Sequence, residues 1–596
     1  MAESKPLALR RQKIASRALS GSFTRLAEVV VDHPSFHISE PFSYGIPDSI
    51  KDEVAIGSWV RVPFQSQILD GVVISISELQ ATSAKPLSKI LKFQPLSSNQ
   101  IALMKEIARR YGVRLVDILR FIPRVPIHHT AVKVPKARNE NRVTYRSFSE
   151  ISLTEILDEI VNFAQTTLVI VPTERQAEYF TKQIRTRTER PVIHFRSEET
   201  KPQLKAAWSL IQSSANPIVL GSRSAVFLEI IGLQRIYLLN ELSDHLWERR
   251  SPYWNARDVL LLKSRLEGIE LRIVSGSPSM ELARLLELGG ISAERRWLRP
   301  KNRRQLAFLP SSYHATIRNG IKSGSVLVSV AEKGYSSSLV CKKCRSVPRC
   351  NCGGRLAISS RGIYTCNLCS IRRDSFQCLE CGSNEKLMLR RGAERITEEL
   401  GKSFPYVNIA IATSERQQPE ISDHMIIVAT SGVEPIGFEY SGLVLLDGEL
   451  HFNRPHLRAA EILLDKWMSL VSMTSSNASI FLSLEASNPI SRAISRGDAS
   501  AFSKVELAER KNLALPPWYR IIQLKGAGSA LHDFSSRLIN EFPFVKASMG
   551  LEVNSMTLRV PVERSEEVIS SLFAVQKYRS ATRQKLFEIR IDQLEI

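Results

Sequence analysis

Three absences narrow the class of protein to which this 596-residue chain can belong. No cysteine lies outside residues 341–381, unlike the dispersed cysteines of a secreted disulfide framework. The apolar runs, such as residues 166–172, are far shorter than the roughly 20 residues that cross a bilayer. Residues 1–16 contain no apolar segment of the signal-peptide type. These absences predict a cytoplasmic protein that does not act at a membrane.

Negative charge is scarce relative to positive charge. The chain has 81 Lys and Arg against 60 Asp and Glu, a formal net charge of +21. Neutralising the phosphates of a polyanion releases counterions, so this excess favours nucleic acid as a partner. The alternative is a basic protein without such a partner. The apolar content of 43% is ordinary for globular proteins, and the length suggests about three to five domains.

The eight cysteines form four close pairs. Three pairs are C-x-x-C, and the fourth is the tighter C-x-C of residues 350–352. Two such pairs supply the four thiolates of a closed, tetrahedral zinc site, so the set predicts two structural Zn²⁺ ions with no thiol left over. Disulfides, a redox-active pair and iron–sulfur clusters are the alternatives. The predicted ligands are Cys341, Cys344, Cys350, Cys352, Cys366, Cys369, Cys378 and Cys381.

Basic residues surround these cysteines. Eleven Lys and Arg lie between residues 341 and 391, against three acidic residues. This balance predicts contacts with a phosphate backbone, whereas the alternative is a solvated face that binds nothing. The candidate DNA-binding residues of this segment are Lys342, Lys343, Arg372 and Arg373.

Short apolar runs alternate with stretches of helical periodicity through the middle of the chain. This alternation predicts two α/β lobes, each with a parallel sheet, and the cysteines interrupt the second lobe after its first run. Two such lobes with the charge of a nucleic-acid-binding protein suggest a helicase motor. The runs lie at residues 167–172, 217–221, 235–240 and 271–277 in the first series, and at 325–330, 407–413, 425–430, 442–447 and 479–484 in the second.

The parts with which a helicase motor handles ATP are missing. No glycine lies between Gly112 and Gly221, so no phosphate loop precedes the run at 167–172. The one Gly-Lys-Ser triplet, residues 401–403, ends a helical run and lacks the first glycine of such a loop. Asn240 replaces the Asp of the Asp-Glu pair that holds Mg²⁺, and it lacks the anionic oxygen that Mg²⁺ prefers. The sequence therefore predicts no catalytic residue and no bound ATP or Mg²⁺.

Several segments resemble, in order and spacing, the PriA family of replication restart proteins over nearly the whole chain. Two motifs depart from the family. Residues 240–243, Asn-Glu-Leu-Ser, stand in place of D-E-E-H, and residues 468–481 contain no arginine where the family has an arginine-rich segment. The chain thus resembles a helicase-degenerate branch of the family. Besides the cysteines, the similar segments are residues 27–64, 221–227, 253–268, 275–283, 390–405, 454–467 and 506–520.

The resemblance implies a multidomain α/β fold with two helicase-like (RecA-type) parallel-sheet lobes, the second interrupted by a two-zinc, eight-cysteine module. An N-terminal β-rich DNA-binding domain and a C-terminal α+β domain would flank the lobes. The implied boundaries are 1–95 for the domain that binds a 3′ DNA end, 96–140 for a short helical winged-helix remnant and linker, 141–300 for lobe 1, 301–338 with 386–500 for lobe 2, 339–385 for the cysteine module and 501–596 for the C-terminal domain.

The resemblance also implies ligand sets and DNA contacts that spacing alone leaves open. Phe42 and Arg61 would lie at or near the DNA-binding surface of the N-terminal domain. Ser43 stands where the family has an Asp, and Gln65 where it has a Gly. With these two departures, the resemblance implies DNA binding but not strict recognition of a 3′-OH end. One zinc would be held by Cys341, Cys344, Cys378 and Cys381, and the second by Cys350, Cys352, Cys366 and Cys369.

For function, the resemblance implies binding of branched or forked DNA at abandoned replication forks, primosome assembly and reloading of the replicative helicase, without unwinding by ATP. The implied partners are a helicase loader or the replicative helicase, with single-strand-binding protein as a further one, and the implied location is the nucleoid. Two alternatives stay open. One is an active ATP-dependent 3′→5′ DNA helicase of the same family, and the other is a general zinc-ribbon nucleic-acid-binding protein.

Overall fold

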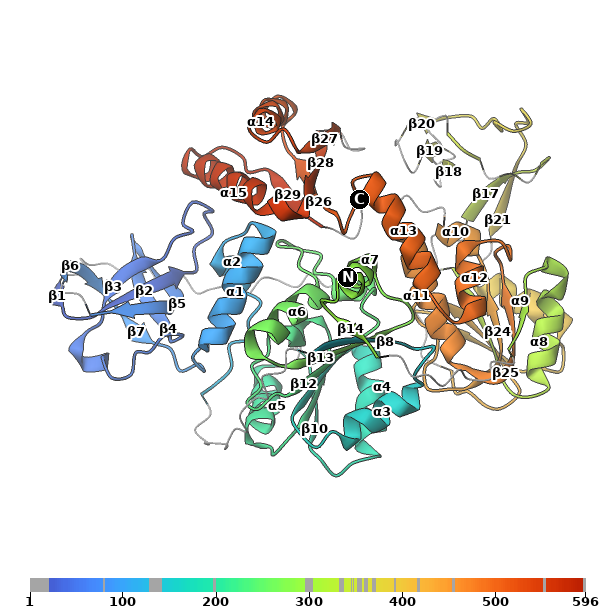
Figure 1. Cartoon of the computed structure of the whole chain (residues 1–596), viewed down its shortest axis with the longest axis horizontal. Coiled ribbons are helices and arrows are strands. Elements are labelled where there is room, and N and C mark those ends of the chain that lie inside the picture. Colours follow the sequence, from blue (N-terminus) through green and yellow to red (C-terminus); the bar gives the residue numbers. More distant parts are fainter. Residues whose placement is uncertain are drawn as a thin grey trace.

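Six β-sheets organise the computed structural model (Figure 1). The N-terminal sheet lies at one end, the two helix-covered lobes lie side by side, and the C-terminal domain and the cysteine module lie along one edge. Among the described residues, no helix is long and apolar enough to cross a membrane. The structure describes residues 21–78, 81–127, 142–196, 200–294, 304–331, 337–344, 346, 348–350, 356–358, 363–366, 371–390, 393–414, 419–452, 456–549 and 554–592.

The N-terminal sheet has seven strands in the order β1-β6-β3-β2-β5-β4-β7. Its core is a cluster of Val, Ile, Phe and Tyr side chains from alternating positions of β2, β3, β4 and β5. Gln65 forms the tight turn between β4 and β5 with a φ of 52°, a left-handed conformation that favours glycine. The turn therefore persists although its glycine is replaced. The strands are β1 (Gly21–Phe23), β2 (Leu26–Val31), β3 (Phe42–Gly45), β4 (Trp59–Phe64), β5 (Gln67–Ser77), β6 (Ala81–Pro86) and β7 (Lys89–Ile90).

A short helical unit joins this sheet to the rest of the chain. It consists of α1 (Ser98–Tyr111) and α2 (Leu115–Leu119). Ser97 and Gln100 form a capping box that begins α1, and Gly112, with a φ of 60°, ends it. A Cβ on Gly112 would lie 2.8 Å from a methyl group of Ile569 in the C-terminal domain. Helix α1 packs against both lobe 1 and the C-terminal domain, so all three share one apolar core.

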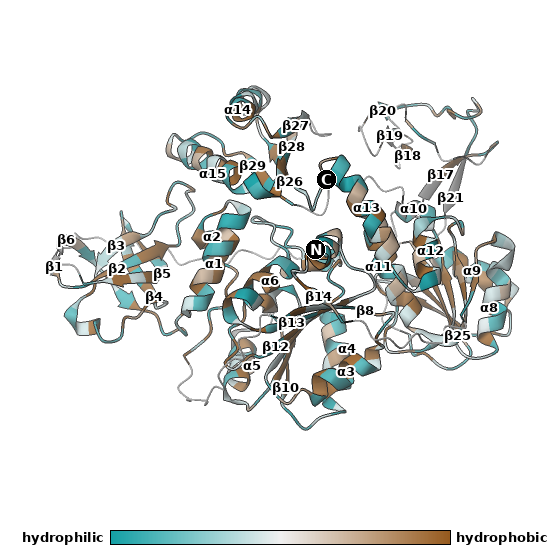
Figure 2. Cartoon of the chain, viewed as in Figure 1, coloured by the Kyte–Doolittle hydropathy of each residue, from teal (hydrophilic) through white to brown (hydrophobic). Residues whose placement is uncertain are grey.

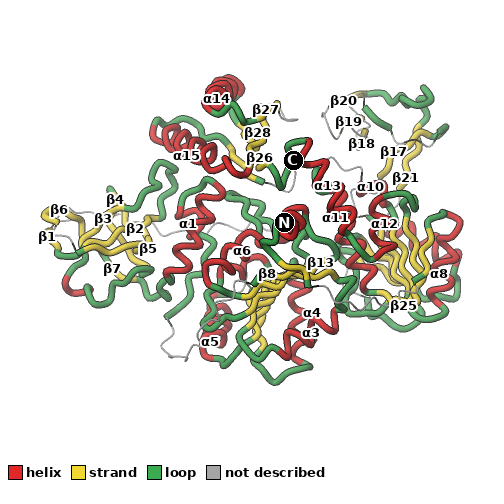
Figure 3. The backbone as a smooth tube through the Cα atoms, in the orientation of Figure 1, coloured by secondary structure: helices red, strands yellow, loops and turns green. Residues whose placement is uncertain are grey.

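Lobe 1 is a seven-stranded parallel sheet in the order β10-β11-β9-β12-β13-β8-β14, with helices on both faces (Figure 3). The central strands are mostly apolar (Figure 2), as burial on both faces requires. The strands are β8 (Val143–Ser147), β9 (Thr167–Ile170), β10 (Val192–Phe195), β11 (Ile218–Gly221), β12 (Arg235–Leu239), β13 (Glu270–Ser275) and β14 (Ser292–Ala293), and the helices are α3 (Leu153–Asn162), α4 (Glu174–Arg185), α5 (Lys201–Ser213), α6 (Ala256–Glu267) and α7 (Met280–Glu287).

Lobe 2 is a six-stranded parallel sheet in the order β15-β25-β24-β16-β23-β22. The cysteine module leaves this lobe after β16 and returns to it at α9. The strands are β15 (Gln305–Ala307), β16 (Val326–Val330), β22 (Ile409–Ala412), β23 (Ile426–Thr430), β24 (Tyr440–Leu445) and β25 (Thr474–Leu482), and the helices are α8 (Tyr313–Ile321), α9 (Ala393–Ser403), α10 (Gly448–Phe452), α11 (Ala459–Ser472), α12 (Pro489–Arg496) and α13 (Ser500–Asn512).

Two small sheets build the cysteine module, and one antiparallel sheet builds the C-terminal domain. In the module, β17 (Ser337–Cys341) pairs with β21 (Lys386–Arg390), and β18 (Leu356–Ile358), β19 (Tyr364–Cys366) and β20 (Arg372–Arg373) form a separate sheet. The C-terminal sheet has the order β27-β28-β26-β29 and packs on two helices. Its elements are β26 (Tyr519–Lys525), α14 (Gly528–Glu541), β27 (Lys546–Met549), β28 (Ser555–Pro561), α15 (Ser565–Ala581) and β29 (Glu588–Ile591).

The predicted fold class is thus confirmed: a multidomain α/β chain with two parallel-sheet lobes, a β-rich N-terminal domain, a cysteine module within the second lobe and a C-terminal α+β domain. The individual domain boundaries stay predictions. The short edge strands β14 and β15 were not among the predicted runs.

Candidate metal site and nucleotide-site region

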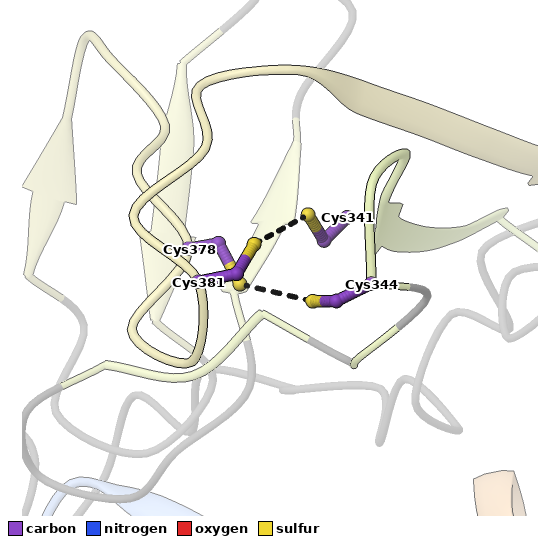
Figure 4. Close-up of side chains that lie close together, drawn as sticks. All are labelled: Cys341, Cys344, Cys378 and Cys381. Carbon is purple, nitrogen blue, oxygen red and sulfur yellow. Dashed lines mark hydrogen bonds between the residues drawn. The ribbon is translucent and has the colours of Figure 1, made fainter.

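Four cysteine sulfurs of the cysteine module lie close together, all within 4.8 Å of one another (Figure 4). Strand β17 ends at Cys341, Cys344 follows in the next turn, and Cys378 and Cys381 come from the turn that precedes β21. The Sγ atoms of Cys341 and Cys381 are 3.5 Å apart, and those of Cys344 and Cys378 are 3.6 Å apart. These separations exceed the roughly 2.05 Å of a disulfide and approach the sulfur–sulfur edge of about 3.8 Å in a tetrahedron with Zn–S bonds of about 2.3 Å.

The four sulfurs affect one another's ionisation, so that one thiol ionises readily and another resists ionisation. The Ser346 hydroxyl, 3.0 Å from Cys344 Sγ and 3.2 Å from Cys378 Sγ, is the largest cause that lowers the pKa of Cys378, to about 6. The Ser383 amide lowers the pKa of Cys381, but the sulfurs of Cys344 and Cys341 outweigh it and raise that pKa to about 12. Four thiolates at this distance repel one another, so the cluster fits a divalent metal ion that neutralises them.

The second predicted ligand set lies partly outside the described residues. Cys350 and Cys366 are buried in the small apolar core of the module, whereas Cys352 and Cys369 lie outside the described residues. Arg373 Nη2 is 3.8 Å from Cys350 Sγ, which places a positive charge beside that sulfur. The second zinc site stays a prediction.

The candidate DNA-binding residues lie in two separate places. Phe42 on β3 is half-buried, with its ring 5.1 Å from that of Phe64. Arg61 on β4 is exposed and pairs with Asp70 at 3.1 Å. Strands β2 and β5 separate β3 from β4 in the strand order, although the contact with Phe64 brings Phe42 to the end of β4.

In the cysteine module, the four candidate cations have different surroundings. Lys342 is exposed and pairs with Glu385 at 3.2 Å, and Lys343 and Arg372 are exposed. Arg373 is half-buried and approaches Cys350. Lys342, Lys343 and Arg372 are therefore the members of this set whose side chains are open to a phosphate backbone.

The segment between β8 and α3 occupies the position of a phosphate loop, because such a loop joins a buried strand to a helix. Backbone amides of this segment and of the start of α3 already donate hydrogen bonds within the protein. Ser152 N donates to Glu155 Oε2 at 2.9 Å, Glu155 N donates to Ser152 Oγ at 3.2 Å, and Ser149 N donates to Ser147 Oγ at 3.2 Å. The capping box occupies these amides, and the carboxylates of Glu150 and Glu155 repel an anion at the position where ATP would place its phosphates.

The Asn240-Glu241 pair after β12 is buried and engaged. Glu241 is 1% exposed; its Oε1 accepts from Ser279 N at 2.7 Å, and its Oε2 lies 3.2 Å from Arg257 Nη1. Burial raises the pKa of Glu241, although Arg257 and Ser279 offset part of the effect. Glu241 thus joins α6, through Arg257, to the start of α7, through Ser279.

Lobe 2 contributes its own charged residues to this region, which sequence reasoning missed. Those from α11 and the residue before it contact loop 276–279 and α7 of lobe 1, and the one from α13 pairs with Glu461 of α11. The sequence held one indication of these residues, the presence of Glu461 and Asp465 in the largely apolar α11. Carboxylates are seldom fully buried unless they are partnered. The residues are Arg458, Glu461, Asp465 and Arg510.

Comparison with known proteins finds similarity to replication restart proteins named PriA. Residues 28–123 match PriA_3primeBD, the 3′DNA-binding domain (3′BD). The "Probable replication restart protein PriA" of Mycobacterium leprae is 25% identical, over 94% of this chain and 99% of that protein, and its counterpart in Mycobacterium tuberculosis H37Rv is 26% identical over the same shares. The "Replication restart protein PriA" of Rickettsia conorii is 23% identical, over 82% of this chain and 86% of that protein.

Similarity to solved structures is lower. RecG bound to a three-way DNA junction is 11% identical, covers 70% of this chain and 55% of RecG, and has a TM-score of 0.34. Dbp5 of S. cerevisiae bound to RNA and ADP BeF3 has the same identity and TM-score and covers 70% of this chain and 98% of Dbp5. The two-lobe description given above rests on the strand order of this chain itself.

Proposed function

The chain belongs to the PriA family of replication restart proteins, and from this membership we propose that it binds abandoned replication forks and helps to reload the replicative helicase without hydrolysing ATP. DNA is its partner, and its role in restart is that of a binding platform. The observation that carries the proposal is Glu241, the one remaining acidic residue of the Mg²⁺-holding pair, which is buried and engaged by Arg257 and Ser279.

DNA binding is supported at two levels. The match to the 3′ DNA-binding domain spans the N-terminal sheet from β2 onward and the helical unit α1–α2, and it contains both Phe42 and Arg61. The net charge of +21 favours a polyanion through counterion release. Within the cysteine module, the exposed Lys342, Lys343 and Arg372 would add phosphate contacts.

Two zinc ions per chain would fold the cysteine module. Cys341, Cys344, Cys378 and Cys381 would hold one ion, and Cys350, Cys352, Cys366 and Cys369 would hold the other. The module has a core of only a few apolar side chains, among them Leu339, and a core of that size seldom sustains a fold without a metal. The metal would therefore supply stability, and the surface of the module would supply contacts.

The proposed function differs from that of an active helicase in lacking motor activity. The β8–α3 segment offers carboxylates and occupied amides in place of a phosphate cradle. Asn240 donates from its Nδ2 to Ser469 Oγ at 3.3 Å, so the residue that would hold Mg²⁺ contacts lobe 2 instead. A protein with these features would work at the nucleoid through its contacts with DNA and with primosome proteins such as a helicase loader, the replicative helicase or single-strand-binding protein.

A single set of samples tests the proposal. Binding of the zinc-loaded full-length chain to a three-way DNA fork is compared with binding to linear duplex of equal length and to duplex RNA, and ATP hydrolysis is measured with the fork at saturation. We expect preference for the fork and no DNA-stimulated hydrolysis. Hydrolysis that rises with fork DNA and disappears in Glu241→Gln would establish a helicase, and equal binding of all three nucleic acids would establish a general nucleic-acid binder.

A further inference from the structure

We infer that lobes 1 and 2 are joined into one rigid unit by a seam of apolar packing and buried charged side chains, and that ATP does not open this seam. The seam is defined here as loop 276–279 and α7 of lobe 1 with residues 458–469 and Arg510 of lobe 2. The inference deepens the proposed function, on which its consequence for DNA binding rests. A helicase motor, by contrast, must open and close its lobes with each nucleotide.

The first contact across the seam joins Asp465 of α11 to the backbone of lobe 1. Its Oδ1 accepts hydrogen bonds from Gly276 N at 2.7 Å and from Ser277 N at 3.1 Å. The two chains approach so closely that a Cβ on Gly276 would lie 1.9 Å from the Asp465 carbonyl oxygen. The glycine is required here by the proximity of lobe 2, because its φ does not lie in the left-handed region.

The second contact is a two-pronged ion pair. Arg458 Nη1 and Nη2 lie 2.7 and 2.5 Å from the two carboxylate oxygens of Glu281 on α7. Glu461, one turn along from Arg458, accepts from Met280 N at 2.9 Å. Paired donors and acceptors of this kind fix both direction and distance, so they allow one relative position of the two lobes.

These groups form one connected network. Arg257 of lobe 1 contacts both Glu241 and Glu281, and Arg510 of α13 contacts Glu461 at 3.2 Å. Arg458, Glu461 and Arg510 are each at most 2% exposed, although all are charged. Such a network specifies geometry more than it adds affinity, because its charges must give up water to meet.

Apolar burial supplies the affinity. The side chain of Met280, from the start of α7 in lobe 1, is fully buried in the apolar core of lobe 2. Ile436, from the loop after β23 in lobe 2, packs in turn against the core of lobe 1. Each lobe thus inserts a side chain into the other, and opening would expose both to water.

A second attachment lies on α4, away from the seam. Arg175 Nη2 donates to Val433 O at 3.2 Å, and a Cβ on Gly437 would lie 1.9 Å from Tyr179 Oη. The loop that carries Val433, Ile436 and Gly437 is bound back to lobe 2, because Glu434 accepts from Ser329 at 2.7 Å and pairs with Lys466 of α11 at 3.4 Å. Two attachments on different elements restrain rotation, which a single contact would permit.

The closed arrangement leaves little room for a nucleotide. A cavity of about 290 Å³ lies between the β8–α3 segment and α11, and it is lined by Phe148, Glu150, Glu155, Met468 and Ile494 among others. Arg304, which also lines the cavity, already donates to Thr474 Oγ1 and O at 2.9 Å, and the carboxylates and apolar side chains do not attract a triphosphate. The surfaces of the two lobes that meet DNA would therefore keep one relative geometry, with or without ATP.

Hydrogen exchange on the full-length, zinc-loaded chain tests this inference. The readout is the exchange rate of two segments from opposite sides of the seam, residues 276–283 and α11, with and without a non-hydrolysable ATP analogue. We expect slow exchange in both and no change with the analogue. Fast exchange like that of exposed loops, or a faster rate with the analogue, would show that the lobes open.

A wedge variant tests whether the two sides are coupled. Gly276→Ala places a methyl group against the Asp465 backbone and should speed exchange in both segments together by about tenfold. The matched control is Gly401→Ala on α9, where an added Cβ meets nothing within 4 Å. Faster exchange confined to residues 276–283 would overturn the inference.

Unchanged exchange in the N-terminal sheet and unchanged zinc content would show that the wedge variant is folded. ATP hydrolysis and fork binding are read in separate assays, so a seam that opens without hydrolysis would refute the rigid unit and leave the proposed function standing.

Discussion

Replacement of Asp465 by Asn removes the one carboxyl group of the seam that pairs with no guanidinium among the described residues. Burial raises the pKa of Asp465 from 3.8 to about 7; the Ser277 and Gly276 amides offset part of this rise, and the Glu241 and Glu461 carboxylates add to it. Tyr145 of β8 also lies within its electrostatic reach. Asn can accept the same two amide hydrogen bonds, but it does not titrate.

The sign of the effect follows from where the proton resides. Between pH 4 and pH 7 the folded chain retains the Asp465 proton and the unfolded chain has lost it, so stability falls as pH rises through this window. At about 1.4 kcal/mol per pH unit, the loss is roughly 3 kcal/mol between pH 5 and pH 8. For a unit the size of the two lobes together, about 1–2 °C per kcal/mol converts this loss into roughly 3–6 °C in Tm.

The assay is thermal unfolding of the wild type and of Asp465→Asn from pH 5 to pH 8. The difference in Tm between the two proteins is the quantity of interest, because the other titrating groups are common to both. We expect the Tm of the variant, relative to that of the wild type, to rise by roughly 3–6 °C between pH 5 and pH 8. Asp423→Asn, which removes an exposed carboxylate from the same lobe, is the matched control. Parallel curves for the wild type and Asp465→Asn would refute a buried, proton-holding Asp465.

Three further predictions concern the metal, the DNA and the buried ion pairs. Cys378→Ser should lower the zinc content by about one ion per chain, as measured by elemental analysis, and an unchanged content would exclude Cys378 as a ligand. Arg61→Ala should weaken fork binding and reduce the slope of log K against log salt by about one, whereas an unchanged slope would exclude a phosphate contact. Arg257→Ala should cost about 3–5 kcal/mol in thermal or denaturant unfolding, because it leaves Glu241 buried and unpaired, while the exposed Arg249→Ala should cost far less.

Much of the fold could be predicted because its signals are local. Each of the nine predicted apolar runs coincides with a strand of one of the two lobes, since a parallel strand buried on both faces is apolar along its length. Strands β8, β10, β14 and β15 were missed, and the shortest of them, β14 and β15, have only two or three residues and carry no periodicity. Their positions are set by pairing with β8 and β25, which are distant in sequence.

The cysteine cluster and the seam between the lobes also differ in how far the sequence predicts them. The cysteine pairs could be identified from spacing, since a C-x-x-C knuckle is a local motif, but which two pairs come together was implied only by the family resemblance. The seam was not accessible, because Glu281 and Arg458 are 177 residues apart in the chain. A charged residue in an apolar helix shows that it has a partner, but a single sequence does not identify that partner.

Loss of the phosphate loop and formation of the seam reinforce each other. In a motor, the cleft between the lobes must stay hydrated and mobile so that ATP, Mg²⁺ and water can enter and leave. Once the β8–α3 segment no longer binds phosphate, that constraint disappears, and side chains such as Met280 and Glu461 can fill the interface. Filling it then sequesters Glu241 against Arg257 and Ser279, so that a restored phosphate loop alone would still face a catalytic acid that has no access to water. In the proposed function, the arrangement would replace a nucleotide-dependent hinge with a fixed support for the N-terminal domain, the cysteine module and the C-terminal domain.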